Sequence, residues 1–231
     1  MAISRGGAER TVDRTSVKAL RACGDQAAEG FSEAYEILLK RLDGVLFRKA
    51  GKAETPVLQQ LYLDSSQALW TSRRVMMREF QAALKHNFRQ SLRREISPEL
   101  DFNREREHDY ELSLLENSNL DDYLVLTQMA TDITRVSRAE INGIERKVSE
   151  LLQDPELQQY QSPFTPMAVS YAIGHACTKA NFSPRMKALV MELCAKHLAE
   201  VFLVPFERLL DLLSDPRQVV AALNRGKAQP Q

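Results

Sequence analysis

The 231-residue chain has few residues that interrupt secondary structure. Only 9 glycines and 9 prolines occur, so turns are few and the elements between them must be long. Three cysteines at scattered positions make no disulfide framework, which indicates a reducing compartment. No run approaches the roughly 20 apolar residues that a membrane span requires, and the polar first 13 residues lack the apolar core of a signal peptide. We therefore expect a cytoplasmic protein.

The chain also lacks a net charge and the common motifs of catalysis. Its 31 basic residues balance 31 acidic ones, so attraction to nucleic acid or anionic lipid must come from a local patch. No glycine-rich phosphate loop, no Gly-x-Ser-x-Gly turn and no His-Glu-x-x-His pair is present. Few loops are available to position catalytic groups. We expect a non-catalytic protein without a cofactor.

Hydrophobic residues, 44% of the chain, recur at helical spacing along most of it. Steps of three and four predict one amphipathic helix over residues 15–49, in which glycines mark either a break or a close helix crossing. Thr55 and Pro56 are typical of an N-cap and a first helical position, and they predict a second helix towards residue 95, with Leu58 on its buried side. Two long helices joined by a short turn form an antiparallel hairpin.

Further helices are predicted in the second half of the chain. One extends over residues 120–152. Three others begin where a capping side chain precedes a proline, at Thr165, Ser183 and Asp215, and they cover residues 166–180, 184–213 and 216–224. Pro205 lies inside one of these helices and should kink it.

These patterns predict an all-α fold in which a long antiparallel helical hairpin is followed by a C-terminal helical bundle. The charged, aperiodic stretch at 97–110 is interpreted as a linker between them. The expected units are a flexible tail (1–14), the hairpin (15–96), the linker (97–110), the bundle (111–224) and a second flexible tail (225–231).

The most informative feature is a basic stripe on the second predicted helix. At about 100° per residue, five basic residues fall within one arc opposite the apolar face: Arg74, Arg78, Lys85, Arg89 and Arg93. We call this stripe the basic ridge. It is either a docking surface for an acidic partner or a solvated face that is neutralised by acidic residues such as Glu116, Asp121 and Asp122.

Two sets of residues could suggest a metal, and neither completes a site. Glu105-x-x-His108 has the spacing used by di-iron helical bundles, but the second copy that such bundles need is absent. Four residues suit zinc by type: His175, Cys177, Cys194 and His197. Because residues two apart on a helix point to nearly opposite sides, His175 and Cys177 should not converge. We expect no bound metal.

Two segments resemble a known family. The segment 111–124, ELSLLENSNLDDYL, is similar to a Leu-Ser-Leu block followed by acidic residues in the proteobacterial domain-of-unknown-function family sixteen thirty-one. The segment 162–166, SPFTP, resembles the family's Asn-Pro-Leu-x-Pro block, with Ser162 in place of the usual Asn. Residues 16–88 are similar in pattern to its long N-terminal helices. Members typically continue for several hundred residues, so the chain is either a short relative or an N-terminal domain. Some members are labelled thymidine phosphorylase, but no phosphate-binding loop supports that activity here.

The sequence thus favours a helical interaction module, a scaffold or adaptor in bacterial cytoplasmic signalling or regulation. Its most favoured partner is another protein, bound through the basic ridge and through the acidic patch of Glu116, Asp121 and Asp122. The alternative is a nucleic-acid-binding protein that uses the same ridge. The sequence leaves open whether the protein forms a homodimer.

Overall fold

The computed structural model describes residues 14–96, 120–152, 162 and 164–216. All regular secondary structure in these ranges is helical, which confirms the predicted all-α fold. Two long helices come first, α1 (Arg14–Ala50) and α2 (Pro56–Ile96). Five shorter helices follow: α4 (Leu120–Val136), α5 (Arg138–Leu152), α6 (Pro166–Lys179), α7 (Pro184–His197) and α8 (Ala199–Ser214).

Side-chain caps start three of these helices where the sequence predicts them. Thr55 accepts a hydrogen bond from the backbone N–H of Leu58 at 3.3 Å. Thr165 and Ser183 accept equivalent bonds from residues three positions later, at 3.2 and 3.4 Å. Each cap satisfies one of the backbone donors that a helix N-terminus leaves without a partner, and the proline that follows has no donor to satisfy. The helix predicted over 216–224 and the linker at 97–110 fall outside the described residues, apart from Pro216.

Two predicted helices are each divided by a bend. The segment 120–152 bends at Ser137, where the hydrogen bonds continue on both sides, from Ser137 to Ile133 and from Ile141 to Ser137. The segment 184–213 is divided at Leu198, and α8 continues through Pro205, where the sequence predicts a kink. At Leu198 the carbonyl accepts from the N–H groups of both Val201 and Phe202 at 3.0 Å, so the turn tightens there.

The core joins the hairpin to the shorter helices through aromatic side chains. Phe31 of α1 has no exposed surface, and its ring lies 6.1 Å from that of Phe88 in α2. On its other side it packs against two rings of α8, Phe202 at 6.1 Å and Phe206 at 5.0 Å. Tyr35 stacks on Phe80 of α2 at 4.3 Å. One buried cluster therefore includes residues from all seven helices. The division of the chain into two units stays a prediction.

Small residues let pairs of helices approach closely. A Cβ atom on Gly174 of α6 would lie 2.9 Å from a methyl group of Leu126 in α4, which is closer than packed carbon atoms come. In α1, which has no break, a Cβ on Gly24 would lie 3.0 Å from the Phe164 ring. Because Phe164 precedes α6 and is not part of a helix, Gly24 marks neither the break nor the close helix crossing that the sequence left open.

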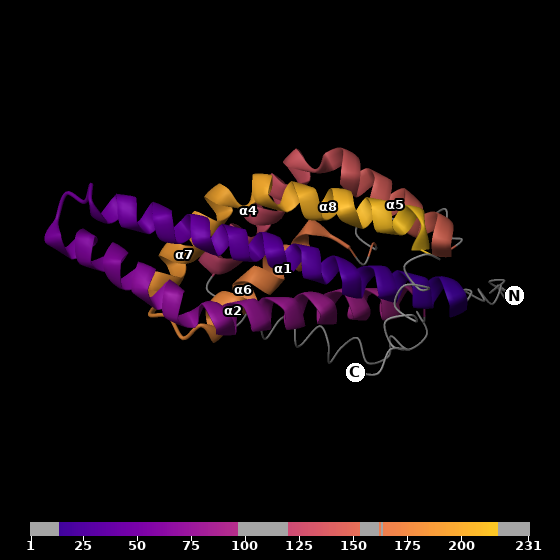
Figure 1. Cartoon of the computed structure of the whole chain (residues 1–231), viewed down its shortest axis with the longest axis horizontal. Coiled ribbons are helices and arrows are strands. Elements are labelled where there is room, and N and C mark those ends of the chain that lie inside the picture. Colours follow the sequence, from indigo (N-terminus) through magenta and orange to yellow (C-terminus); the bar gives the residue numbers. More distant parts are fainter. Residues whose placement is uncertain (1–13, 97–119, 153–161, 163, 217–231) are drawn as a thin grey trace, which may run out of the picture.

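The hairpin extends beyond the other helices at one end (Figure 1). Among the hydrogen bonds and ion pairs that join the described parts of the hairpin and the bundle, two lie nearest to this end. Arg41 pairs with Glu200 of α8 at 3.6 Å, and the hydroxyl of Ser72 donates to the carbonyl of Ala180 at 3.2 Å. We call residues 42–71, between these two contacts, the arm. Leu58, which was predicted to be buried, is 39% exposed because only two helices meet at this end.

Candidate partner-binding surface

The basic ridge lies on the outer side of α2, as the helical spacing predicts. The inner side buries a run of residues spaced four apart, which are at most 4% exposed: Met76, Phe80, Leu84 and Phe88. Arg74, Arg78 and Arg89 on the other side are exposed, and Lys85 is half-buried. Figure 1 shows α2 along one edge of the molecule, with α1 and α6 on its inner side. The ridge is therefore accessible along much of α2.

Two ridge residues pair with carboxylates. Arg89 reaches across to α1, where its guanidinium donates to both oxygens of Asp25 at 2.8 and 3.0 Å. Arg78 donates twice to its neighbour Glu79, at 2.8 and 3.0 Å. The bonds from Arg78 keep the pKa of Glu79 below its ordinary value. These two positive charges are thus partly neutralised within the fold.

The other two described ridge side chains have no such partner. Within the described part of the chain, no carboxylate lies within ion-pairing distance of Arg74 or Lys85. Adjacent to the ridge, Arg73 pairs with Glu36 of α1, which also pairs with Lys40. At its centre and at the end towards the arm, the ridge therefore carries positive charge that no carboxylate of the described residues neutralises. The side chain of Arg93 falls outside the described residues.

Of the three residues in the predicted acidic patch, the structure describes the side chain of Asp122 alone. Asp122 lies in the first turn of α4, where its carboxylate accepts a hydrogen bond from Lys187 of α7 at 2.6 Å. Both side chains are largely buried, and the helix N-terminus also favours a negative charge. Asp122 therefore joins α4 to α7. Glu116 and the side chain of Asp121 fall outside the described residues, so their predicted role in binding stays a prediction.

The candidate zinc residues are divided between two places. Cys177 and Cys194 meet in the core, where a hydrogen bond to Cys177 and burial raise the pKa of the Cys194 thiol. His175 faces Glu79 at 3.6 Å on the surface. His197 lies near Arg41 and Arg48, and burial and these cations lower its pKa. Among the described residues, no three potential metal ligands converge. Glu105 and His108 fall outside these residues.

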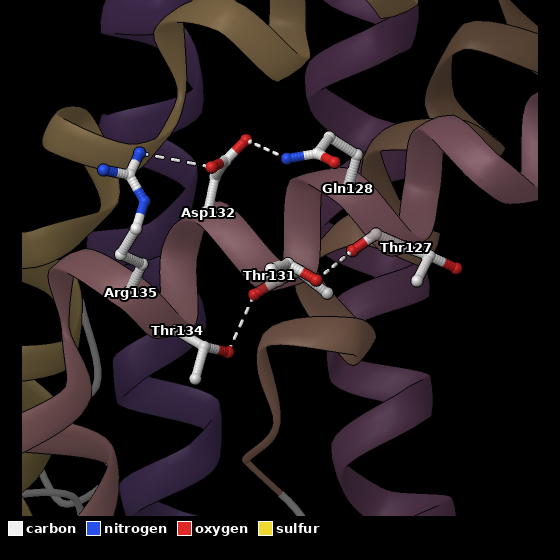
Figure 2. A network of polar contacts seen from close by, with 7 residues as sticks. Thr127, Gln128, Thr131, Asp132, Thr134 and Arg135 are labelled. Carbon is white, nitrogen blue, oxygen red and sulfur yellow. Dashed lines mark hydrogen bonds and ion pairs between the residues drawn. The ribbon is translucent and has the colours of Figure 1, made fainter.

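Figure 2 shows a polar network on α4 that is satisfied within the helix. Asp132 accepts from Gln128 at 2.8 Å and from Arg135 at 3.2 Å. The threonine hydroxyls of this helix each donate to the carbonyl four residues earlier: Thr127, Thr131 and Thr134. Because each group finds its partner within α4, the network is accounted for by the helix itself and gives no indication of a binding site.

Sequence reasoning missed a group of exposed apolar residues next to the ridge. Trp70, the single tryptophan of the chain, is 72% exposed, and Phe47 is 70% exposed. Leu63, seven residues before Trp70, is 39% exposed. The seven-residue spacing could have placed Leu63 and Trp70 on one side of the helix, but it could not show that the side faces solvent.

The fold and the ridge define an all-helical protein with an extended, partly neutralised basic surface. Residues 16–213 match the model of the family described as Protein of unknown function (DUF1631) N-terminal domain. The chain belongs to this family, as its two sequence blocks indicated. No curated protein and no solved structure matches the chain. None of the described helices combines the length and the low polarity needed to cross a bilayer.

Proposed function

We propose that this protein is a non-catalytic interaction module of the bacterial cytoplasm, a scaffold or adaptor in signalling or regulation that binds another protein through the basic ridge. The observation that carries the proposal is the charge of Arg74 and Lys85 on the outer side of a 41-residue helix, where no carboxylate of the described residues pairs with them. An acidic partner would gain from pairing with these groups and would be steered towards them.

The length of α2 supports a protein partner. Long helices offer extended faces to other helices, and docking of one helix against another is a common mode of recognition. In contrast, proteins that bind single-stranded nucleic acid place several aromatic rings among their basic residues. Only one exposed ring on α2, that of Trp70, adjoins the described ridge.

The test is to recover the tagged full chain from native lysate, with and without nuclease, and to identify what binds. The proposal predicts a protein that is recovered equally well after nuclease treatment. Loss of the bound material on nuclease treatment would instead indicate that the ridge binds nucleic acid. In that case, binding should also weaken steeply as the salt concentration rises, because each neutralised phosphate releases counterions.

A further inference from the structure

Exposed apolar side chains are concentrated on the arm. Of the nine large hydrophobic residues that are exposed in the described part of the chain, five lie within residues 42–71: Phe47, Val57, Leu58, Leu63 and Trp70. Single exposed hydrophobic residues are normal on a soluble protein, whereas a contiguous group is typical of an interaction site. The arrangement of these side chains therefore decides whether they form one surface.

Three of them lie on one side of the arm. Asp43 of α1 accepts a hydrogen bond from Ser66 of α2, which fixes how the two helices face each other there. Leu63 and Trp70 lie one turn to either side of Ser66, and Phe47 lies one turn beyond Asp43. We call Phe47, Leu63 and Trp70 the arm patch. From their exposed fractions of 70, 39 and 72%, these side chains present roughly 300–400 Å² of apolar surface, the size of a functional patch.

The arm patch is continuous with the basic ridge. Arg74 lies four residues after Trp70 and therefore next to it on the surface of α2, followed by Arg78 and Lys85. From Leu63 to Lys85 the surface is about 33 Å long, at 1.5 Å per residue. It is apolar at the end towards the turn and basic at the other end, a pattern that a single helix can match along its length.

The charges favour a different protein over a second copy of this chain. If two arm patches met in parallel, ridge would lie against ridge. If they met antiparallel, each ridge would lie towards the turn of the other copy, where Arg48, Lys49 and Lys52 outnumber Glu54. Both arrangements bring like charges together. A partner with acidic residues avoids this repulsion.

A bilayer is also a poorer match. The carboxylates of Asp43 and Asp64 are on the same arm as the apolar side chains. An anionic membrane surface would repel these groups, and burial in the headgroup region would cost their hydration. A helix of a partner protein, in contrast, can place polar side chains opposite Asp43 and Asp64.

We propose that the arm patch and the basic ridge together bind an amphipathic helix of a partner protein, whose apolar residues cover Phe47, Leu63 and Trp70 and whose acidic residues face Arg74, Arg78 and Lys85. This inference deepens the proposed function and rests on it. It adds the chemical class of the partner segment and its position along α2.

The test places a photo-crosslinking amino acid in the full chain at Trp70, at Phe47 and, as a matched control, at Val204, which is 46% exposed and belongs to α8, outside the arm. The inference predicts adducts at positions 70 and 47 with one segment of one protein, several-fold above the yield at 204. That segment should have apolar residues at helical spacing and acidic residues towards the ridge end. An adduct with lipid, nucleic acid or a second copy overturns the inference, as does a yield no higher than the control.

This result is separable from the test of the proposed function. If a protein is recovered from lysate but positions 47 and 70 give no specific adduct, the interaction module stands and the arm patch is not its binding site. If no protein is recovered, the proposed function itself fails. All three crosslinking positions are exposed, so their substitution should leave the helical circular dichroism signal unchanged.

Discussion

Phe31 should be among the most important side chains for stability. It is fully buried in α1 and packs against three rings from two other helices. Phe31→Ala removes the ring and leaves a cavity, and such changes cost about 3–5 kcal/mol. Aromatic pairs contribute about 0.5–1.5 kcal/mol beyond the area that they bury, so the upper part of this range is expected. A folded domain is stable by only about 5–15 kcal/mol, so the loss would be a large fraction of the total.

The assay is urea unfolding followed by circular dichroism, with the free energy of unfolding obtained by linear extrapolation. The matched control is Phe47→Ala, which makes the same chemical change on the same helix at a side chain that is 70% exposed. The control should change stability by no more than about 0.5 kcal/mol. A cost of about 1 kcal/mol or less for Phe31→Ala, or an equal cost for both variants, would refute the described core.

Three further predictions concern other parts of the fold. Asp122→Asn should lower the free energy of unfolding by about 1–2 kcal/mol, because its partner Lys187 is largely buried and loses its charged acceptor. Asp132→Asn should cost no more than about 0.5 kcal/mol, because its partner Arg135 is exposed and stays solvated without the pair. Equal costs would contradict the bond between α4 and α7. The three buried cysteines should resist a thiol reagent at pH 8 in the native protein and react with it in urea. Burial also keeps the Cys23 thiol protonated at this pH, because it raises the pKa of Cys23 to about 11. Fast labelling of the native protein would contradict the burial of these thiols. His197 has a lowered pKa in the folded state, so the unfolded chain binds a proton first as the pH falls. The contribution of neutral His197 to the free energy of unfolding is fully present above about pH 6.5 and should be lost as the pH falls through the folded pKa. His197→Gln should therefore flatten the dependence of stability on pH below 6.5, and an unchanged dependence would exclude this cause.

Local chemistry made much of the fold predictable. A capping side chain followed by a proline acts within one helical turn, so Thr55, Thr165 and Ser183 identified helix starts directly. The two bends were not predictable in the same way. Around Ser137 and Leu198 the local residues are compatible with a continuous helix, and the backbone hydrogen bonds continue through both bends. Their positions depend on packing against other helices.

The candidate surface was predictable in part for a similar reason. Helical spacing placed Arg74, Arg78, Lys85 and Arg89 on one side of α2. It could not show which of them would be neutralised, because Arg89 finds its partner 64 positions away in the sequence. The exposure of Trp70 depends on where the other helices end along the hairpin, which is a property of the tertiary structure alone.

The central claim is that the basic ridge binds a protein partner. The most direct measurement compares the amount of partner recovered by the wild-type chain with that recovered by two variants in the same nuclease-treated lysate. The first variant reverses three ridge charges, with Arg74→Glu, Arg78→Glu and Lys85→Glu. The second makes the same change in net charge at exposed positions on α5 and α7: Arg138→Glu, Arg146→Glu and Arg185→Glu. We predict that the ridge variant loses the partner while the control variant retains it. Equal recovery by both variants, with both folded, would contradict the claim.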